Sequence, residues 1–151
     1  MKKRILVLSD SHGYSLQSLL MKAESMGPID AVFHLGDGFP DLERYAGQLP
    51  EWYFVQGNCD WQAAERERVV SLFGKSFLLA HGHHYSVKST MTLYEDRARE
   101  LGVYAALFGH THIPYNEYRN GILFLNPGAA IDRHFALLDV LDGGELYARM
   151  Y

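Results

Sequence analysis

The sequence predicts an α/β fold whose first half forms a parallel sheet. Residues 5–8 are continuously apolar, which is typical of a strand buried on both faces. A segment with helical spacing follows over 15–26 and ends at Gly27-Pro28. Further strands are predicted over 31–35 and 52–55, with a short helix over 40–46 between them. This alternation of strand and helix indicates right-handed crossovers between parallel strands.

The second half is richer in strands. Residues 68–73 and 76–80 flank Gly74-Lys75 and predict a hairpin, and 103–108 predict another buried strand. A polar amphipathic helix is predicted over 89–101, with an apolar face formed by Met91, Leu93, Tyr94, Ala98 and Leu101. Later β segments are expected at 115–118, 122–125, 135–140 and 146–150. Because no repeat or linker interrupts the pattern, we expect one domain over 1–151.

Composition limits the classes of partner. No apolar stretch approaches the ~20 residues of a membrane span, and the run after Met1–Arg4 is too short for a signal peptide, so a cytoplasmic protein is expected. The net charge of −4 and the scattered basic residues argue against a nucleic-acid polymer as partner. The single cysteine excludes an internal disulfide and a thiolate zinc site. Edge strands leave homodimerisation open.

Seven potential metal ligands stand at strand-to-loop junctions. They fall in five short strings punctuated by glycine or serine, and at least three of these strings follow an apolar run. Loops that leave the carboxyl ends of strands can direct their side chains to a common point beside the sheet. The sequence therefore predicts one shared metal site made of Asp10, His12, Asp37, Asn58, His81, His110 and His112.

The ligand set suits the hydrolysis of a phosphate ester. Two cations ~3.5–4 Å apart neutralise the phosphate and acidify a water molecule. Asp37 stands alone at a strand end and suits a bridge between them, whereas Asp10 and His12 are two residues apart and can face one ion together. Oxygen and imidazole donors favour transition metals over Ca²⁺ or Mg²⁺. We expect two divalent ions, with Mn²⁺ preferred and Ni²⁺, Fe²⁺, Co²⁺ or Zn²⁺ as alternatives.

These strings resemble those of the calcineurin-like metallophosphoesterase superfamily. The short chain and Asn58-Cys59-Asp60 resemble its small prokaryotic phosphodiesterase branch, which is related to the retromer cargo-recognition subunit. The resemblance runs from Asp10 to the turn at 126–128, and all five strings in order are highly specific. It implies a four-layer α/β/β/α sandwich with two mixed sheets and the metals at the strand ends.

The resemblance also implies roles for the ligands. Asp10, His12 and His112 would hold the first ion, Asp37 would bridge, and the second ion would be held by Asn58, His81 and His110. A hydroxide that bridges the ions would attack phosphorus in line. The expected activity is that of a phosphodiesterase acting on a small phosphate ester. The alternative is a non-catalytic protein-binding scaffold like the retromer subunit, although a scaffold has no reason to keep every donor.

Cys59 departs from the wider superfamily, where many members carry a histidine that is thought to protonate the leaving group. A thiol has an ordinary pKa near 8.5 and is a weak acid for this task. His83 is the most available substitute, so we expect Asp37, Asn58 and His83 to act directly in catalysis.

Other polar residues near these strings have competing explanations. Asp10 could instead cap a helix that begins near Tyr14, and Asp60 could orient a ligand or simply form a turn. His34 is expected to be a core histidine or the partner of a ligand. Substrate specificity is expected to come from loops around Phe39, Trp61 and Tyr85.

Overall fold

The computed structural model describes residues 2–151 and contains two five-stranded sheets. The first sheet has the strand order β10-β9-β1-β2-β3. Its strands are β1 (Lys3–Leu8), β2 (Ala31–His34), β3 (Glu51–Phe54), β9 (Ala136–Val140) and β10 (Leu146–Met150). The second sheet has the order β4-β5-β6-β8-β7. Its strands are β4 (Glu67–Leu72), β5 (Lys75–Ala80), β6 (Ala105–Leu107), β7 (Tyr115–Arg119) and β8 (Ile122–Asn126).

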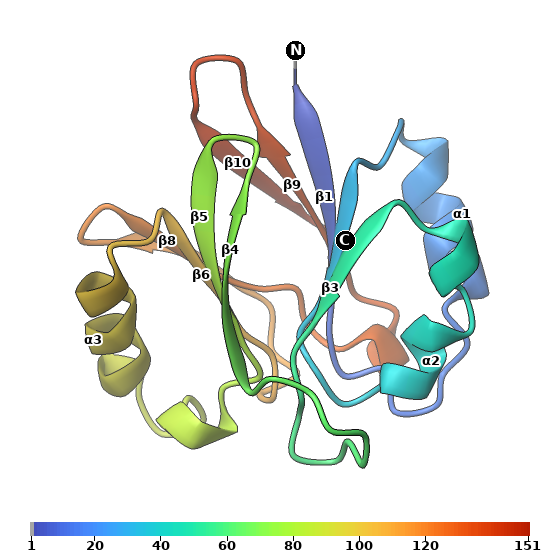
Figure 1. Cartoon of the computed structure of the whole chain (residues 1–151), viewed down its shortest axis with the longest axis horizontal. Helices are drawn as coiled ribbons and strands as arrows, with labels where there is room; N and C mark the ends of the chain where they lie inside the picture. The colour runs from blue at the N-terminus through green and yellow to red at the C-terminus, as the bar shows by residue number, and fades with distance from the viewer. Residues whose placement is uncertain (1) are drawn as a thin grey trace.

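Helices cover the outer faces of the two sheets, which gives four layers (Figure 1). Helices α1 (Gln17–Ser25) and α2 (Phe39–Glu43) lie beside the first sheet, and α3 (Thr92–Leu101) lies beside the second. Short 3₁₀ turns are η1 (Ala46–Gln48), η2 (His83–Tyr85) and η3 (Ala130–Asp132). The four-layer sandwich with two mixed sheets is thus confirmed.

Each sheet combines parallel and antiparallel pairing. In the first sheet, β1 pairs with β2 and β2 with β3 in parallel, whereas β1 also pairs antiparallel with β9, with Ile5 opposite Leu138. In the second sheet, β5, β6 and β8 are parallel neighbours, and the hairpins β4–β5 and β7–β8 add antiparallel edges. The carboxyl ends of β1, β2 and β3 therefore share one edge of their sheet, as do those of β5 and β6.

Apolar side chains fill three interfaces between the layers. One cluster lies between the sheets and includes Ile5, Phe33, Phe77 and Leu138. A second joins the first sheet to α1 and α2, and a third joins the second sheet to α3 through Tyr94. Because β1 contributes alternate residues to two of these clusters, it is buried on both faces, as its continuous apolar run predicts.

Two details of the sequence prediction are wrong. The β4–β5 turn is formed by Phe73-Gly74, both at positive φ, and Lys75 already belongs to β5. This is the two-residue turn that matches strand twist, and Asn120-Gly121 forms the same kind between β7 and β8. Helix α3 begins at Thr92 rather than near residue 89, and Leu93 is 52% exposed because helical geometry turns it away from the face that buries Tyr94.

No helix within residues 2–151 has the length and hydropathy that crossing a membrane would require.

Candidate metal centre

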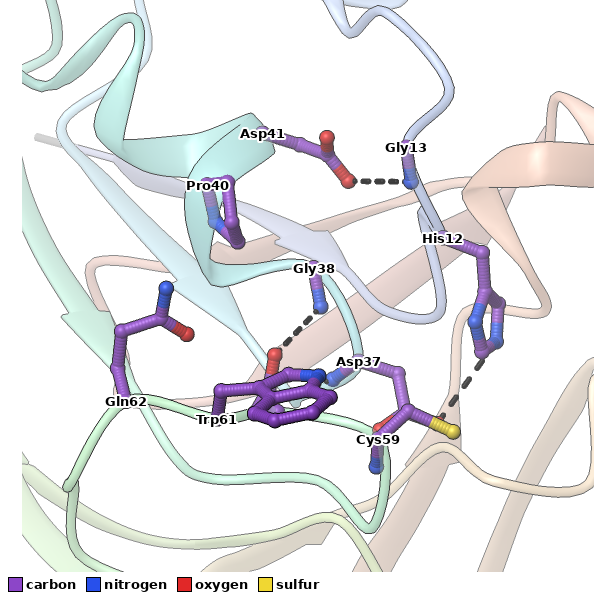
Figure 2. Close-up of a pocket in the computed structure, with 10 residues that line it drawn as sticks. His12, Gly13, Asp37, Gly38, Pro40, Asp41, Cys59, Trp61 and Gln62 are labelled. Atoms are coloured by element: carbon purple, nitrogen blue, oxygen red, sulfur yellow. Dashed lines mark hydrogen bonds and ion pairs between the residues drawn. The ribbon is translucent and has the colours of Figure 1, made fainter.

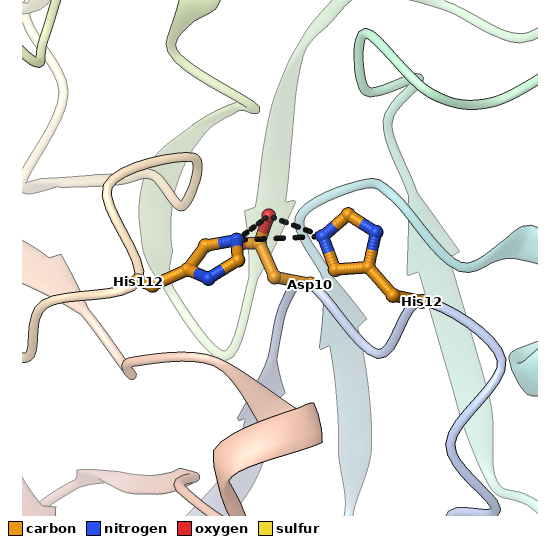
Figure 3. A group of neighbouring side chains, drawn as sticks. All are labelled: Asp10, His12 and His112. Atoms are coloured by element: carbon orange, nitrogen blue, oxygen red, sulfur yellow. Dashed lines mark hydrogen bonds and ion pairs between the residues drawn. The ribbon is translucent and has the colours of Figure 1, made fainter.

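The loops that follow β1, β2, β3, β5 and β6 carry the predicted ligands to one region of the molecule. Asp10 and His12 follow β1, Asp37 follows β2, and His81 is the first residue after β5. Within this region the side chains of Asp10, His12 and His112 form a compact group (Figure 3). Oδ1 of Asp10 lies 3.3 Å from Nε2 of His112 and 3.6 Å from Nε2 of His12. The two imidazole Nε2 atoms are 3.4 Å apart.

A second group consists of Asp10, Asp37 and His81, all of them buried. Nε2 of His81 lies 3.2 Å from Oδ2 of Asp37 and 3.6 Å from Oδ1 of Asp10. Nδ1 of His81 donates to the carbonyl oxygen of Leu35 over 2.7 Å, so the proton of a neutral ring is held on that nitrogen. Nε2 is then left with its lone pair directed at the carboxylates, as a metal ligand requires.

Among residues 2–151, Nδ1 of His83 beside this centre is buried without a hydrogen bond, and so are two atoms of the candidate ligands, Oδ1 of Asp10 and Nε2 of His81. Burial of polar atoms without partners is costly, and a buried carboxylate oxygen costs more than a neutral group. Both atoms belong to the second group, and Oδ1 of Asp10 also faces His12 and His112. Their convergence fits divalent cations, which would satisfy them together.

The remaining predicted site residues lie at the margin of these groups. The ring of His110 is 5.1 Å from that of His81, and the ring of His83 is 5.4 Å from it. Asn58 is exposed, and its amide nitrogen lies 3.6 Å from Sγ of Cys59. The structure thus brings together potential ligand atoms of Asp10, His12, Asp37, His81 and His112 and leaves Asn58 and His110 outside these groups. The ligand roles of all seven residues stay predictions.

The thiol of Cys59 also lies near the candidate ligands. Sγ of Cys59 forms a third group with ligand atoms of His12 and Asp37, all within 4.8 Å of one another. One cysteine cannot build a multi-thiolate zinc site, but it can join a mixed set. Burial and the nearby carboxylate of Asp37 raise the pKa of the thiol, which disfavours the thiolate that a metal would bind.

The ionisation of Asp37 and His81 is coupled. Burial favours the neutral acid of Asp37, but its contacts with His81 and the Cys59 N–H outweigh burial and hold the pKa of the carboxyl well below its usual range. Burial likewise opposes the imidazolium of His81, but Asp37 and Asp10 outweigh it and raise the pKa of the ring. In the absence of cations, a proton on His81 therefore offsets part of the negative charge of the centre.

The pKa values of His83 and His110 are lowered, in contrast to that of His81. Burial, with smaller contributions from His84 and His81, lowers the pKa of His83 to about 4. Burial also lowers the pKa of His110, assisted by the charges of His81 and Lys88. Neutral His110 suits metal binding, whereas a low pKa leaves little of His83 protonated at neutral pH, which weakens its case as a general acid.

Backbone strain is concentrated at the centre. Of the seven predicted ligands, five have positive φ values between 45° and 68°: Asp10, His12, Asp37, His110 and His112. Non-glycine residues seldom adopt this conformation, and each costs of order 1 kcal/mol or more. Such residues persist where the surrounding structure over-determines them. The strain turns successive ligands of one loop toward the same point.

Asp60 holds two of these loops together through four hydrogen bonds from backbone N–H groups. Its Oδ2 accepts the N–H groups of Asp37 and Gly57, both over 2.7 Å, and its Oδ1 accepts those of Gly38 and Phe39 over 3.0 and 3.1 Å. One carboxylate thereby ties the loop after β3 to the loop that carries Asp37. The sequence prediction allowed an orienting role for Asp60 but did not identify backbone amides as its partners.

Asn126 holds the loop that carries His110 and His112. Its buried amide donates to the carbonyl oxygen of Gly109 and to Oγ1 of Thr111, each over 3.0 Å. Its Oδ1 accepts the N–H of Gly128, so every part of the side chain is used. In the sequence, the 126–128 turn marks only the end of the family resemblance, and the contact of Asn126 with this loop was not predicted.

Glycines next to the ligands permit close approach of the loops. A Cβ atom at Gly57 would lie 2.1 Å from Oδ1 of Asp37, and one at Gly109 would lie 1.9 Å from Oγ of Ser9. Both neighbours belong to packed ligand loops and cannot easily move. Gly57 before Asn58 and Gly109 before His110 are therefore required by space and not by backbone conformation, since neither has a positive φ.

His34 supports the centre from the core. It is buried, its Nδ1 accepts the Gly36 N–H over 3.1 Å, and its Nε2 lies 3.0 Å from Oγ of Ser11, between the ligands Asp10 and His12. Because Nδ1 accepts, the proton of the neutral ring lies on Nε2 and is donated to Ser11. His34 is thus a buried histidine that contacts a ligand loop, in agreement with the sequence interpretation.

We expect His34 to make the folded protein less stable as the pH is lowered. Burial lowers the pKa of His34 from 6.5 to about 4. Between these pH values the imidazole is therefore protonated in the unfolded chain but neutral in the folded chain. The free energy of unfolding should therefore decrease by about 3 kcal/mol between pH 6.5 and 4 from this group. His34→Asn, whose amide oxygen can accept the Gly36 N–H, should have a shallower slope in denaturant titrations across this range. Equal slopes would contradict the assignment.

An open cavity of about 390 Å³ adjoins the centre (Figure 2). Its lining includes His12, Asp37 and Cys59, together with Trp61 and Gln62 from the loop after β3. In Figure 2, Gln62 and His12 stand at opposite sides and Trp61 lies between them. Trp61 is 96% exposed, which places an apolar ring in water beside the candidate ligands. The prediction that this loop borders the substrate site is consistent with that position.

The comparisons with known proteins agree with this geometry. The model of the calcineurin-like phosphoesterase superfamily domain matches residues 3–143. The chain therefore belongs to the calcineurin-like phosphoesterase superfamily. It is 34% identical over 128 residues to YsnB of Bacillus subtilis, which is described as a probable metallophosphoesterase. The alignment covers 83% of this chain and 73% of YsnB.

Solved structures show the same architecture. A predicted phosphoesterase from Streptococcus pneumoniae aligns with a TM-score of 0.79 and 28% identity, covering 100% of this chain and 98% of the other. Vacuolar Protein Sorting 29 from Cryptosporidium parvum aligns with a TM-score of 0.81 and 20% identity, covering 99% and 97%. At that identity the second likeness shows the fold alone. Family membership implies divalent metal ions, and the candidate ligands described above could hold them.

Proposed function

We propose that this protein is a two-metal phosphodiesterase that hydrolyses a small phosphate ester. The observation that supports it most is the pair of buried atoms without hydrogen bonds, Oδ1 of Asp10 and Nε2 of His81, at the meeting point of carboxylates and imidazoles from both sheets. Asp10, His12 and His112 would hold one ion and Asn58, His81 and His110 the other, with Asp37 shared between them. Bound ions would supply charge neutralisation of the phosphate and acidification of the attacking water.

The charge of the cavity favours a diester over a monoester. A phosphomonoester carries up to two negative charges at neutral pH, whereas a diester carries one. The cavity beside the centre is lined by no lysine or arginine among residues 2–151, while Asp37, Asp41 and Asp60 all border it. The two ions would therefore provide most of the positive charge, which suits a singly charged substrate better than a doubly charged one.

Activity after metal exchange tests the proposal. The protein would be stripped with a chelator, reloaded separately with Mn²⁺, Ni²⁺, Fe²⁺, Co²⁺ or Zn²⁺, and assayed with bis(4-nitrophenyl) phosphate and 4-nitrophenyl phosphate. We expect no turnover without metal, the highest turnover with Mn²⁺, and a higher kcat/KM for the diester. A protein that binds two ions per chain but hydrolyses neither ester would refute the enzymatic proposal.

Cys59 provides a prediction about the leaving group. Its raised pKa and weak acidity argue against proton donation, so Cys59→Ala should keep kcat/KM for an activated aryl diester within a few-fold of the parent. Cys59→His should raise activity on alkyl esters more than on aryl esters, because only poor leaving groups need protonation. Both substrates would be assayed in all three proteins at matched metal content. A 100-fold loss on the aryl diester in Cys59→Ala, with metals bound, would show that the thiol is required.

A protein-binding scaffold is the second candidate, and the likeness to Vacuolar Protein Sorting 29 over 99% of the chain gives it some weight. The convergence of buried, unpaired ligand atoms favours the enzyme, since a binding surface gains nothing from them. A cytoplasmic location and assembly into a homodimer are further parts of the proposal. Sedimentation of the purified chain would test its oligomeric state.

A further inference from the structure

A second cavity, of about 400 Å³, lies beside the loop that carries His110 and His112. Its volume falls in the range of small-molecule sites, roughly 300–1,000 Å³. The lining is mostly apolar, with two polar residues, Lys88 and Thr111. The apolar side chains come from the segment before α3, the end of β6 and the start of β7: Val87, Met91, Phe108, Ile113 and Tyr115.

The cavity and the candidate metal centre share parts of the same loops. Thr111, a wall of the cavity, stands between His110 and His112, and Phe108 is two residues before His110. Val87 packs on Gly82, the residue after His81, where an added Cβ would lie 2.7 Å from Cγ2 of Val87. A molecule held by the metal centre would therefore have this cavity within reach on the side of the second sheet.

The walls of the cavity are fixed by packing. Phe108 and Val87 are buried, and the rings of Phe108 and Tyr115 lie 5.8 Å apart. Oγ1 of Thr111 accepts N–H groups from Asn126 and Ile113, so this hydroxyl anchors the wall and is not free for a ligand. Ile113 is 66% exposed, which leaves a large aliphatic side chain in water next to a polar centre. A ligand that covers Ile113 would remove that surface from water.

Lys88 adds a positive charge to the otherwise mostly apolar lining of the cavity. It is exposed, and it lines the cavity together with Thr111, which stands between His110 and His112 in the sequence. Among the described residues that line the cavity, Lys88 alone carries a positive charge, and it marks the polar end of the lining. An anionic phosphate at that end and an apolar group among Met91, Phe108 and Ile113 match this distribution of charge.

The geometry points to a subsite in this cavity for the apolar organic group of the phosphate ester, an aromatic ring or branched chain, with Lys88 facing the phosphate oxygens. The inference rests on the proposed function and extends it to a substrate class. In a diester, this group would be the one that stays on phosphorus, and the leaving group would lie on the opposite side, toward Trp61 and Cys59.

Two diesters with one leaving group test the subsite. Methyl 4-nitrophenyl phosphate and 2-naphthyl 4-nitrophenyl phosphate differ only in the group that stays. We expect the parent to prefer the naphthyl ester, and Ile113→Ser to reduce that preference in kcat/KM by roughly five- to tenfold, the effect of losing part of one aliphatic contact. Met21→Ser on α1 is the matched control, since Met21 is 64% exposed and lies on the opposite layer. It should leave the preference unchanged.

Binding provides a readout that does not depend on turnover. Calorimetry of the Mn²⁺-loaded protein with 2-naphthylphosphonate and methylphosphonate should show the same loss of naphthyl preference in Ile113→Ser. Lys88→Gln should weaken both phosphonates by a similar factor of a few. Met91→Ser changes a second apolar residue of the lining, and it should repeat the Ile113→Ser result if that variant were to misfold.

The outcomes separate the two proposals. If the parent binds naphthylphosphonate preferentially but hydrolyses neither diester, the enzymatic proposal fails and the subsite stands. If both diesters are hydrolysed with metal but Ile113→Ser and Met91→Ser keep the parent's naphthyl preference in rate and binding, the subsite is refuted. A parent with no naphthyl preference in either measurement also refutes it.

Discussion

Asp37→Asn is expected to lose activity by roughly 10³-fold or more, the largest effect of any substitution considered. Asp37 is the carboxylate proposed to be shared by two ions, and its Oδ2 lies 3.2 Å from Nε2 of His81. An amide oxygen carries no charge and cannot hold two cations as a carboxylate does, so both charge neutralisation and ion spacing would suffer. Steady-state assays with bis(4-nitrophenyl) phosphate at saturating Mn²⁺ would measure the loss.

Stability measurements separate this effect from misfolding. Metal binding to the folded state should raise the Tm of the parent, and Asp37→Asn should lose most of that rise. The metal-free variant should remain folded but be somewhat less stable than the metal-free parent, because the amide keeps an oxygen for the Cys59 N–H but loses the charge that interacts with His81. Glu24→Gln, which removes a charge from exposed α1, is the control. Two bound ions and near-normal rates in Asp37→Asn would refute the shared role.

Asp60→Ala is expected to reduce both stability and metal affinity. Its carboxylate accepts four backbone N–H groups, and charge-assisted hydrogen bonds of this kind are the stronger ones. Their loss should lower the free energy of unfolding by about 3 kcal/mol, a value below the sum of four bonds because Asp60 is partly exposed. The loop that carries Asp37 would loosen, and metal affinity should fall about 10–100-fold.

Asp60→Asn offers a graded comparison. The amide retains one accepting oxygen, so two of the four N–H groups keep a partner while the other two face an NH₂ group. Its stability and metal affinity should therefore lie between those of the parent and Asp60→Ala. Denaturant unfolding and calorimetric metal titration would measure the series. If Asp60→Ala binds metal as tightly as the parent, the carboxylate does not position Asp37.

The fold could be predicted from the sequence wherever a pattern of residues is compatible with only one type of secondary structure. The continuous apolar run at 5–8 indicates a strand buried on both faces, and β1 is such a strand. The start of α3 was predicted less well, because residues 86–91 include polar residues that suit either helix or turns. The structure resolves them as turns that lead from η2 to Thr92.

Some features of the candidate site could likewise be predicted from the sequence and others could not. Residue types at strand ends indicated which side chains meet, because topology alone brings such loops together. The contacts of Asp60 and Asn126 could not be predicted, since most of their partners are backbone groups and the sequence gives no sign of which backbone N–H or carbonyl group is left free. The exposure of Trp61 and the cavity at Ile113 depend on loop conformations that no local pattern specifies.

The pairing of β1 with β9 has a consequence for biosynthesis. The strand that positions Asp10 obtains one of its two neighbours from residues 136–140, and the Ala130 and Ile131 N–H groups donate to the carbonyl oxygens of Ser9 and Asp10. During translation, this ligand loop therefore lacks these later partners until residues 130–140 have left the ribosome. Closing a contact across more than 120 residues also slows folding. A nascent chain would thus acquire metal only as a late event, and chaperones would meet it with the edge of β1 still uncovered.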